Sequence, residues 1–304
     1  EIDVKVPNSP LTDKERKRIA LRANRTKGKD NFDILANWDK EDLLEGWFDE
    51  KDLDKLLNLK PDEKDDQIPE NVEPIAKLGD IWQLGRHRVC CGDSTQPEAV
   101  SALMGGVLAD CVITDPPYGV SYDGGHANDK RRDKLKGDES DALYEPACLM
   151  ANEFSKSGSA FYLFHAGVKG FQAAAAAAAA GYEIRSELIW NKNMAQFGAI
   201  GAQYKQKHEP FYYCFKKGKA PYWNGPNNEV TVWDCDRTSK NEYHPTQKPV
   251  ELIVRALKNS SKEGDAVLDL FGGSGSTLIA CEKTNRIGYM MELDEKYVDV
   301  IIKR

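Results

Sequence analysis

Short apolar runs of strand length alternate with helical patterns from residue 76 to the end of the chain. The runs occupy residues 88–91, 111–114, 160–164, 187–190, 211–215, 266–270 and 287–291. Apolar residues at helical spacing lie between several of them, most clearly over 249–259 and 276–283. Strands that alternate with helices form parallel sheets covered by helices. The pattern therefore predicts an α/β domain with a mostly parallel sheet.

Charged residues are distributed unevenly along the 304-residue chain. It has 42 lysines and arginines against 49 aspartates and glutamates, a formal net charge of −7, which by itself argues against a nucleic-acid partner. Residues 30–75 hold sixteen of those acids and only five basic residues, whereas residues 76–304 hold 28 basic and 29 acidic residues. The acidity therefore belongs to one short segment, and the rest of the chain remains compatible with nucleic acid.

Composition also restricts the compartment and the kinds of site. Hydrophobic residues make up 40% of the chain and charged residues 30%, as in globular proteins of aqueous solution. No run approaches the ~18 apolar residues of a membrane span, and the polar N-terminus does not resemble a signal peptide. The seven cysteines contain no CxxC spacing, and the five histidines show no ligand spacing. We therefore expect a cytoplasmic protein with no membrane contact, no disulfide framework and no metal site.

Three parts of the chain differ in sequence character. Residues 1–60 predict a helical N-terminal segment, in which Thr12 and Glu15 form a capping box and apolar residues follow at helical spacing. Residues 61–75 are rich in acids and proline and predict a linker. The α/β domain then spans 76–304. It includes eight consecutive alanines at 173–180, which favour a helix and carry no chemistry.

The motif Asp115-Pro116-Pro117-Tyr118 directly follows the apolar run at 111–114. A carboxylate in this position lies at the carboxyl end of a strand, where open α/β sheets bind their ligands. The two prolines stiffen the turn and have no N–H group, so that carbonyl acceptors face the site. Rigid acceptors beside the ring of Tyr118 suit an exocyclic amino group on a planar base. The simpler alternative is a proline turn that binds nothing.

A glycine-rich turn at 271–275 follows Asp269, at the end of another predicted strand, and opens a helix at 276. Glycines allow a ligand to approach the backbone closely. The absence of a following Gly-Lys-Ser/Thr excludes a phosphate-binding P-loop, so the turn suits a nucleoside without phosphates. Glu292 ends the next strand about twenty residues further on, where an acid binds ribose hydroxyls. A tight helix–sheet junction without a ligand is the alternative.

Two further motifs carry weaker signals. Asp93 also follows a predicted strand, and a helix N-cap is its simplest explanation. Thr246, Gln247 and Lys248 stand just before the helical pattern at 249–259. Thr246 suits the cap of that helix, but a helix N-terminus beside a lysine also attracts a carboxylate.

Together these motifs resemble those of DNA amino-methyltransferases that use S-adenosylmethionine (SAM). Asp-Pro-Pro-Tyr precedes the glycine-rich turn, which resembles the permuted, beta-type order of that family. The resemblance covers roughly residues 78–304, and it implies a Rossmann-like fold with a seven-stranded sheet. It also implies a restriction–modification setting in a bacterial or phage-infected cell. Residues 11–58 resemble the helical tail of a ParB-like domain.

The resemblance implies roles for individual residues. Asp115, Pro116, Pro117 and Tyr118 correspond to the catalytic loop, where the Asp115 carboxylate and the Pro116 carbonyl accept hydrogen bonds from the amine of a flipped base. Glu292 corresponds to the ribose contact and Asp93 to the adenine edge. The complete set of implied cofactor contacts is Asp93, Thr246, Gln247, Lys248, Asp269, Phe271, Gly272, Gly273, Gly275 and Glu292. Residues 188–192 and 209–213 resemble weaker motifs near the target base.

Candidate DNA contacts are basic residues near the catalytic motifs. The stretch 185–222 holds seven basic and two acidic residues interleaved with aromatics, and 130–136 is a second basic patch. Basic residues contact phosphates and aromatic rings contact bases, but a solvated surface or core packing explains the same residue types. The selected candidates are Lys130, Arg131, Arg132, Lys192, Lys205 and Lys207, and residues 218–243 are the candidate target-recognition region.

The sequence therefore predicts methyl transfer from SAM to N6 of adenine in DNA, at a specific or relaxed site. Asp115 favours adenine, because cytosine-N4 members of the family more often carry serine there; N4 of cytosine is the first alternative. RNA adenine and protein glutamine are further target amines, although a protein substrate goes with Asn in place of Asp115. A non-catalytic DNA-binding or partition-type module, suggested by residues 11–58, is the second alternative. DNA is the expected partner, and a homodimer is one oligomeric option.

Overall fold

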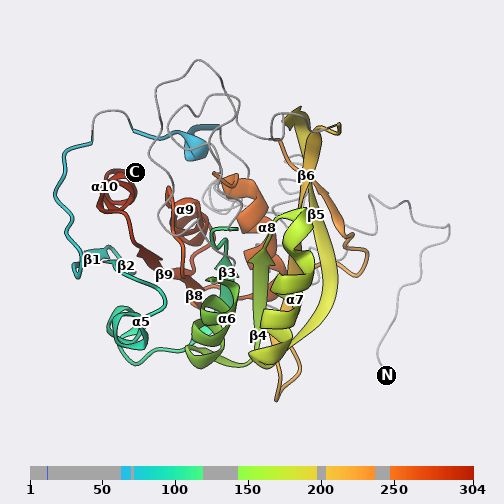
Figure 1. Ribbon diagram of the computed structural model, residues 1–304, viewed down its shortest axis with the longest axis horizontal. Helices are drawn as coiled ribbons and strands as arrows, with labels where there is room; N and C mark the ends of the chain where they lie inside the picture. Colours follow the sequence, from blue (N-terminus) through green and yellow to red (C-terminus); the bar gives the residue numbers. More distant parts are fainter. Residues whose placement is uncertain (1–11, 13–62, 70–71, 119–142, 197–202, 237–246) are drawn as a thin grey trace, which may run out of the picture. The chain divides into compact units, whose positions relative to one another are not determined.

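A computed structural model of the chain describes residue 12 and residues 63–69, 72–118, 143–196, 203–236 and 247–304. Contacts between backbone segments divide the chain into two units, Glu1–Pro61 and Asp62–Arg304. The second unit contains every described helix and strand (Figure 1). The predicted helical segment at 1–60 lies outside the described residues, apart from Thr12.

The described strands form one nine-stranded sheet in the order β1-β2-β9-β8-β3-β4-β6-β5-β7. Their bounds are β1 (Ile81–Leu84), β2 (His87–Cys91), β3 (Ala109–Thr114), β4 (Ser155–Phe164), β5 (Tyr182–Gln196), β6 (Gln206–Lys216), β7 (Val232–Asp234), β8 (Ala266–Asp269) and β9 (Ile287–Glu292). Strands β2, β9, β8, β3 and β4 are parallel to one another. Strands β1 and β6 run antiparallel to their neighbours, and β5 and β7 pair in parallel at the far edge.

The structure confirms the predicted α/β class with its mostly parallel sheet, but the sheet has nine strands where seven were expected. Six of the seven apolar runs lie within one strand each, and the seventh, 266–270, extends one residue beyond β8. The two additional strands, β1 and β7, lie at the two edges of the sheet and are only four and three residues long. Both alternate between buried or half-buried and exposed positions, so neither has the continuous apolar run of a strand buried on both faces.

Helices cover both faces of the sheet (Figure 1). They are α5 (Pro97–Met104), α6 (Tyr144–Glu153), α7 (Gly170–Ala179), α8 (Val250–Ser260), α9 (Ser276–Lys283) and α10 (Glu295–Lys303), with 3-10 turns η1 (Glu63–Asp66) and η3 (Gly167–Lys169). On β3, Val112 packs with α5, α6 and α7, whereas Cys111 and Ile113 pack with α8 and α9. Successive side chains of a strand point to opposite faces, and so a strand with apolar residues at every position needs both helix layers.

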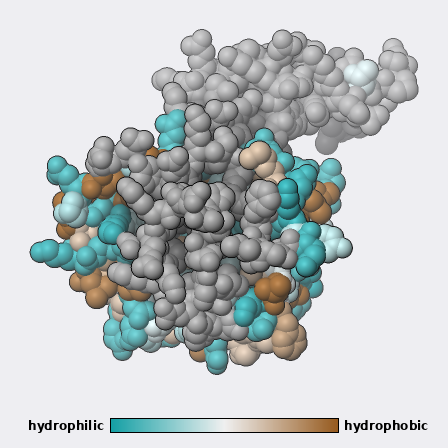
Figure 2. All heavy atoms as spheres, turned by 45° about the horizontal axis from the view of Figure 1, so that its top comes forward, coloured by the Kyte–Doolittle hydropathy of each residue, from teal (hydrophilic) through white to brown (hydrophobic). Residues whose placement is uncertain are grey.

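The described surface contains separate hydrophobic patches among hydrophilic residues, as Figure 2 shows for one face. Isolated apolar side chains of this kind are ordinary for a protein surface. All seven cysteines are buried free thiols. No described helix combines the length and the apolar character that crossing a membrane requires.

The described residues of the predicted linker contact the α/β domain. The carboxylate of Asp66 in η1 accepts a hydrogen bond from the backbone N–H of Val250, at 2.9 Å, in the first turn of α8. Asp65 forms an ion pair with Lys283 of α9. Further along, the Asp299 carboxylate accepts hydrogen bonds from the N–H groups of residues 75 and 76. Residues 63–66 and 75–76 are thus held by α8, α9 and α10.

Asp66 acts as a helix cap supplied by a remote segment, and its loss is expected to destabilise the domain. The Asp66→Ala variant leaves the Val250 N–H without its acceptor, which costs about 1–2 kcal/mol of unfolding free energy, the usual value for a lost N-terminal cap. Urea unfolding measures the difference. Glu73→Ala removes an equally acidic but exposed side chain nearby and should leave the midpoint unchanged. Equal midpoints for both variants would contradict the capping role.

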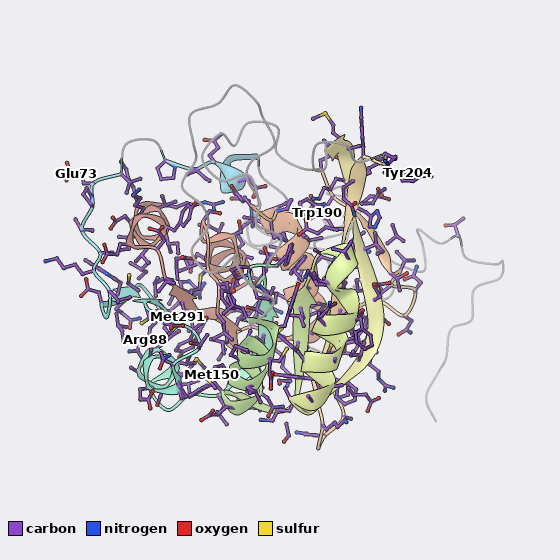
Figure 3. The ribbon with its side chains drawn as sticks, viewed as in Figure 1. Glu73, Arg88, Met150, Trp190, Tyr204 and Met291 are labelled. Atoms are coloured by element: carbon purple, nitrogen blue, oxygen red, sulfur yellow. The ribbon has the colours of Figure 1, made fainter. Side chains whose placement is uncertain are left out.

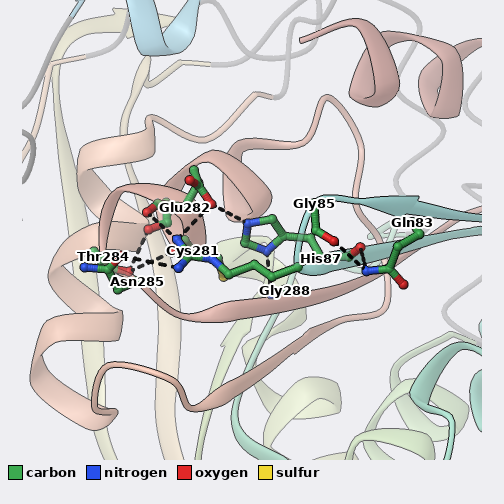
Figure 4. A network of polar contacts seen from close by, with 10 residues as sticks. Gln83, Gly85, His87, Cys281, Glu282, Thr284, Asn285 and Gly288 are labelled. Atoms are coloured by element: carbon green, nitrogen blue, oxygen red, sulfur yellow. Dashed lines mark hydrogen bonds and ion pairs between the residues drawn. The ribbon is translucent and has the colours of Figure 1, made fainter.

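His87, at the start of β2, links this strand to β9 and α9 (Figure 4). Its Nδ1 accepts a hydrogen bond from the Gly288 N–H at 2.9 Å, and its Nε2 lies 2.8 Å from Glu282 Oε2. A backbone N–H can only donate, so the proton of the neutral ring sits on Nε2 and is donated to Glu282. Arg86 binds the same carboxylate oxygen at 2.8 Å. Burial lowers the pKa of His87 below its usual value, and Glu282 opposes this only in part.

The lowered pKa of His87 predicts a loss of stability in acid. A depressed histidine pKa contributes stability that is complete above the unfolded value of about 6.5 and is lost as the pH falls through the folded value. Protonated Nδ1 cannot accept from Gly288, so the melting temperature should fall between about pH 7 and pH 5, with a contribution of about 1 kcal/mol. His87→Gln should flatten this dependence, whereas replacing the exposed His208 by glutamine should not. Parallel curves for all three proteins would refute the assignment.

Candidate active site

The predicted catalytic and cofactor residues meet at the carboxyl edge of the parallel strands. Asp115 follows β3, Asp269 ends β8 and Glu292 ends β9. The next described helix after β3 is α6, on one face of the sheet, whereas β8 is followed by α9 on the other face. Strands β3 and β8 are paired and parallel. Neighbouring parallel strands whose connections leave to opposite faces open a crevice at their carboxyl ends, which is where α/β proteins bind ligands.

Both carboxylate oxygens of Asp115 are engaged by neighbouring side chains. Oδ1 accepts a hydrogen bond from the Tyr118 hydroxyl at 2.6 Å, and Oδ2 forms an ion pair with Lys248 Nζ. The two intervening prolines fix the backbone φ angles of the turn that separates these side chains. Asp115 keeps 27% of its side chain exposed, whereas Lys248 exposes only 7%. The carboxylate is therefore the accessible end of a buried group of charges.

Glu209 of β6 completes this group, which we call the ionic network: Asp115, Tyr118, Lys192, Glu209 and Lys248. Glu209 Oε1 is 2.7 Å from Lys248 Nζ and 2.9 Å from the Tyr118 hydroxyl. Glu209 Oε2 is 2.8 Å from Lys192 Nζ of β5. The two lysines also lie over aromatic rings, Lys192 over Trp190 and Lys248 over Phe164. Two cations and two carboxylates balance within the site, as buried charges require.

The two carboxyl groups of the ionic network titrate in opposite directions. Burial raises the pKa of Asp115, and Glu209 adds to this by repulsion, although Lys248 works against both. Burial also acts on Glu209, but its two lysine partners outweigh it and lower its pKa to about 2. The pKa of the Lys248 ammonium is raised, because the two carboxylates outweigh burial. The lysines thus favour the charged form of Glu209, whereas the raised pKa of Asp115 makes it the group of this pair better suited to exchange a proton.

The glycine-rich turn packs tightly on the end of β9 and on α10. A Cβ atom at Gly272 would lie 2.9 Å from Met290 Cε, and one at Gly275 would lie 3.1 Å from Ile301 Cγ1. Gly275 also has a φ of +88°, in the left-handed region that favours glycine. The N–H of Gly272 donates to the Met291 carbonyl at 2.7 Å. Met290 and Ile301 therefore leave no room for side chains at Gly272 and Gly275, and the turn packs closely against β9 and α10.

The two acids beside the turn are held by neutral donors instead of cations. Asp269 accepts from the Thr277 hydroxyl at 2.6 Å and from the Phe271 N–H at 3.1 Å. Glu292 accepts from the N–H groups of Gly273 and Asp294, one on each oxygen, at 2.8 and 2.9 Å. Burial raises the pKa of both carboxyl groups to about 7, and the hydrogen bonds oppose this only in part. Both acids therefore change charge near neutral pH.

The remaining predicted residues have other contacts, lie at a distance, or fall outside the described part of the chain. Asp93 accepts hydrogen bonds from the N–H and hydroxyl of Thr95. The Gln247 side chain donates to the Asp66 carbonyl at 3.1 Å. Lys205 and Lys207 are exposed at the outer end of the β5–β6 hairpin, where Figure 3 shows Tyr204, far from the interior Trp190. Thr246, Lys130, Arg131, Arg132 and residues 237–243 of the candidate recognition region lie outside the described residues.

Two predicted residues have partners that their sequence context did not suggest. Lys192, predicted to contact DNA, is buried and paired with Glu209. Lys248, predicted to lie near the cofactor, contacts Asp115 and Glu209. Their predicted contacts with DNA and cofactor stay predictions.

Sequence reasoning placed Glu209 near the target base but not among the site residues, and it gave Thr277, at the end of the glycine-rich motif, no role. Glu209 lies in the polar first part of β6, just before the apolar run 211–215, so no local signal singles it out. Thr277 lies eight residues beyond Asp269, in the first turn of α9, where a hydroxyl facing back toward the strand is within reach of the acid.

Comparisons with known proteins place this chain in a family. The sequence model of the N6/N4 methylases, a family described as DNA methylase, matches residues 109–304. The methylase-named protein YubD of Escherichia coli strain K12 is 29% identical over 198 residues, which make up 65% of this chain and 82% of YubD. The type II methyltransferase M.Cfr9I of Citrobacter freundii is 31% identical over 134 residues, 41% of this chain and 45% of that protein.

A solved structure with the same fold is the complex of M1.HpyAVI with SAM. It superposes with a TM-score of 0.57 at 23% sequence identity and covers 71% of this chain and 98% of M1.HpyAVI. The matched part of the family model, residues 109–304, contains β3 to α10 and with them Asp115, the ionic network, the glycine-rich turn and Glu292. The chain therefore belongs to the N6/N4 DNA methylase family.

Proposed function

We propose that this protein transfers a methyl group from SAM to N6 of an adenine in DNA. The observation that carries the proposal is the position of Asp115 and Tyr118 at the end of β3, beside the glycine-rich turn at the end of β8. One strand end offers a rigid acceptor and an aromatic ring, and its neighbour carries the glycine-rich turn. A methyl donor and an amine acceptor need such adjacent sites, because transfer requires the two reactants to be held in contact.

The residues around the glycine-rich turn fit a nucleoside cofactor without phosphates. Each oxygen of Glu292 accepts one N–H and keeps a lone pair, which suits two ribose hydroxyls. The turn has no room for a side chain at Gly272, and the buried Ser276 hydroxyl has no partner among the described residues. We assign Phe271, Gly272, Gly273, Gly275 and Asp269 to the cofactor, with Asp93 at the base edge. Thr246, Gln247 and Lys248 are assigned to its carboxylate region.

The chain's own residues orient the amine. When bound, SAM supplies the methyl group from its sulfonium directly to the amine nitrogen. The Asp115 carboxylate and the Pro116 carbonyl accept hydrogen bonds from the two amine hydrogens and so direct the nitrogen lone pair. Tyr118 stacks on the flipped base, which must leave the duplex to reach a pocket of this kind. The raised pKa of Asp115 suits a group that takes up the proton released by the amine.

DNA phosphates are the proposed partners of the exposed Lys205 and Lys207 and of the basic patch at Lys130, Arg131 and Arg132. Residues 218–243 are the proposed contacts with the edges of the DNA bases. The family includes both adenine and cytosine targets. In this proposal the aspartate at position 115 favours adenine.

Nucleoside analysis of treated DNA tests the proposed reaction. Unmethylated DNA is incubated with the protein and isotopically labelled SAM, digested to nucleosides and examined by mass spectrometry. N6-methyladenine is the expected product. N4-methylcytosine would overturn the base assignment but not the reaction class. Label in RNA or protein with none in DNA would overturn the substrate, and no transfer together with tight DNA binding would favour a non-catalytic module.

A further inference from the structure

The Tyr118 hydroxyl lies within hydrogen-bonding distance of two carboxylates. Its oxygen is 2.6 Å from Asp115 Oδ1 and 2.9 Å from Glu209 Oε1. A tyrosine hydroxyl has a single proton to donate, so it serves one carboxylate at a time. Lys248 faces the same two carboxylates, and its three N–H donors let Nζ pair with Asp115 Oδ2 while it also lies 2.7 Å from Glu209 Oε1. Each donor that engages Asp115 thus has a second acceptor on Glu209.

Asp115 has both oxygens occupied in this arrangement, although the proposed reaction needs it as an acceptor for the target amine. Moving Lys248 or Tyr118 away from Asp115 into an apolar surrounding would leave a buried cation or hydroxyl unpaired, which is costly. Glu209 removes this obstacle, because it already lies at 2.7 and 2.9 Å from the two donors. Asp115 can be released without any movement of the backbone.

We propose that Glu209 is a positioning residue that takes over the hydrogen bonds of Tyr118 and Lys248 when a target amine binds to Asp115. Lys192 holds Glu209 from the other side, with its Nζ 2.8 Å from Oε2. This inference rests on the proposed function and deepens it. Glu209 lies on β6, on the far side of β4 from β3, and it acts through Tyr118 and Lys248 without touching the substrate itself.

Glu209 also affects the charge state of Asp115. Among the described residues, the charged and titratable groups that face the two carboxylates are Lys192, Lys248, Tyr118, His165 and Asp269. Repulsion by Glu209 contributes to the raised pKa of Asp115. Removing the charge at 209 leaves Lys248 to Asp115 alone, and both changes favour the ionised form of Asp115. In a plot of kcat against pH, the fall in kcat on the acid side (the acid limb) should then occur at lower pH. A purely structural role of Glu209 would not produce this shift.

Steady-state methylation by three variants tests this role. Glu209→Gln should lower kcat about 100-fold, because Lys248 stays on Asp115, while the Kd for SAM and the affinity for DNA stay near wild type. Its acid limb, followed from about pH 5 to pH 9, should move to lower pH. Glu209→Asp keeps the charge and should restore the wild-type limb and part of kcat. Glu187→Gln removes an exposed carboxylate from the neighbouring strand β5 and should behave as wild type.

A double variant separates the proposed role from a folding defect, because Glu209→Gln alone leaves the buried Lys192 without its ion-pair partner. Replacing Lys192 by methionine together with Glu209→Gln removes the pair as a unit, which folded proteins tolerate. It should show the same loss of kcat and the same shifted limb. A wild-type protein that methylates no DNA would contradict the proposed function itself. If the wild type is active, either of two results would overturn the role of Glu209. In the first, Glu209→Gln and the double variant both keep kcat within about twofold of wild type. In the second, the acid limbs of their pH profiles do not move.

Discussion

Replacing Asp115 by alanine is expected to abolish methyl transfer while SAM still binds. The variant removes the only charged acceptor that the crevice offers to the amine among the described residues at the end of β3. Loss of one preorganised polar group at a reacting centre lowers kcat by about 10³-fold. The fold should survive, because Lys248 keeps its ion pair with Glu209 at 2.7 Å. Label transfer to DNA and calorimetric titration with SAM measure the two effects separately.

Asp110→Asn is the matched control for this prediction. Asp110 lies at the other end of the same strand, where it pairs with Lys156 at 2.7 Å and is far from the crevice. Its replacement should leave kcat near the wild-type value. Wild-type activity in Asp115→Ala, or an equal loss in Asp110→Asn, would refute the assignment of Asp115.

Replacing Glu292 by alanine is expected to weaken SAM binding by about 100-fold. Two hydrogen bonds from ribose hydroxyls to a charged acceptor account for about 3 kcal/mol, which corresponds to that factor. The variant also frees the N–H groups of Gly273 and Asp294, which the carboxylate holds at the edge of the turn. Calorimetric titration with SAM measures the Kd. Glu295→Gln, three residues further on and exposed, is the control that should bind SAM normally.

The affinity for SAM should also fall as the pH is lowered through 7. Glu292 has a pKa of about 7 in the ligand-free protein, so its carboxylate is protonated below that pH and loses acceptors for the ribose. Affinity should drop up to about tenfold per pH unit below the pKa. Glu292→Gln should flatten the curve, and any remaining slope belongs to Asp269, whose pKa is also about 7. An unchanged slope in Glu292→Gln would contradict a role of the Glu292 charge.

The same two raised pKa values have an effect on folding stability. A carboxyl group whose folded pKa exceeds its unfolded value contributes stability at low pH and loses it as the pH rises through the folded pKa. Asp269 and Glu292 therefore weaken the ligand-free domain toward and above pH 7, whereas His87 weakens it in acid. The two acids contribute least to folding stability at the pH where both are ionised and can accept hydrogen bonds.

The sequence by itself determined the class of the fold and the positions of the catalytic motif and of the glycine-rich turn. Seven strands were visible because each is a continuous apolar run, which is the local consequence of burial on both faces. Asp115, Asp269 and Glu292 were placed at one edge because each follows such a run, and parallel strands end together. The helix at 276–283 was predicted with its observed bounds, since it begins at a glycine-rich turn.

Only the tertiary structure decided which side chains meet in the ionic network. Tyr118 and Glu209 are 91 positions apart, and Asp115 and Lys248 are 133 positions apart, so no local pattern links them. Their contact depends on the sheet order, which places β6 next to β4 and β4 next to β3. The short edge strands β1 and β7 were missed for a related reason, because their pairing comes from neighbours and not from an apolar run of their own. Local periodicity reports how a segment is buried, whereas the partner of a buried charge is set by the packing of distant segments.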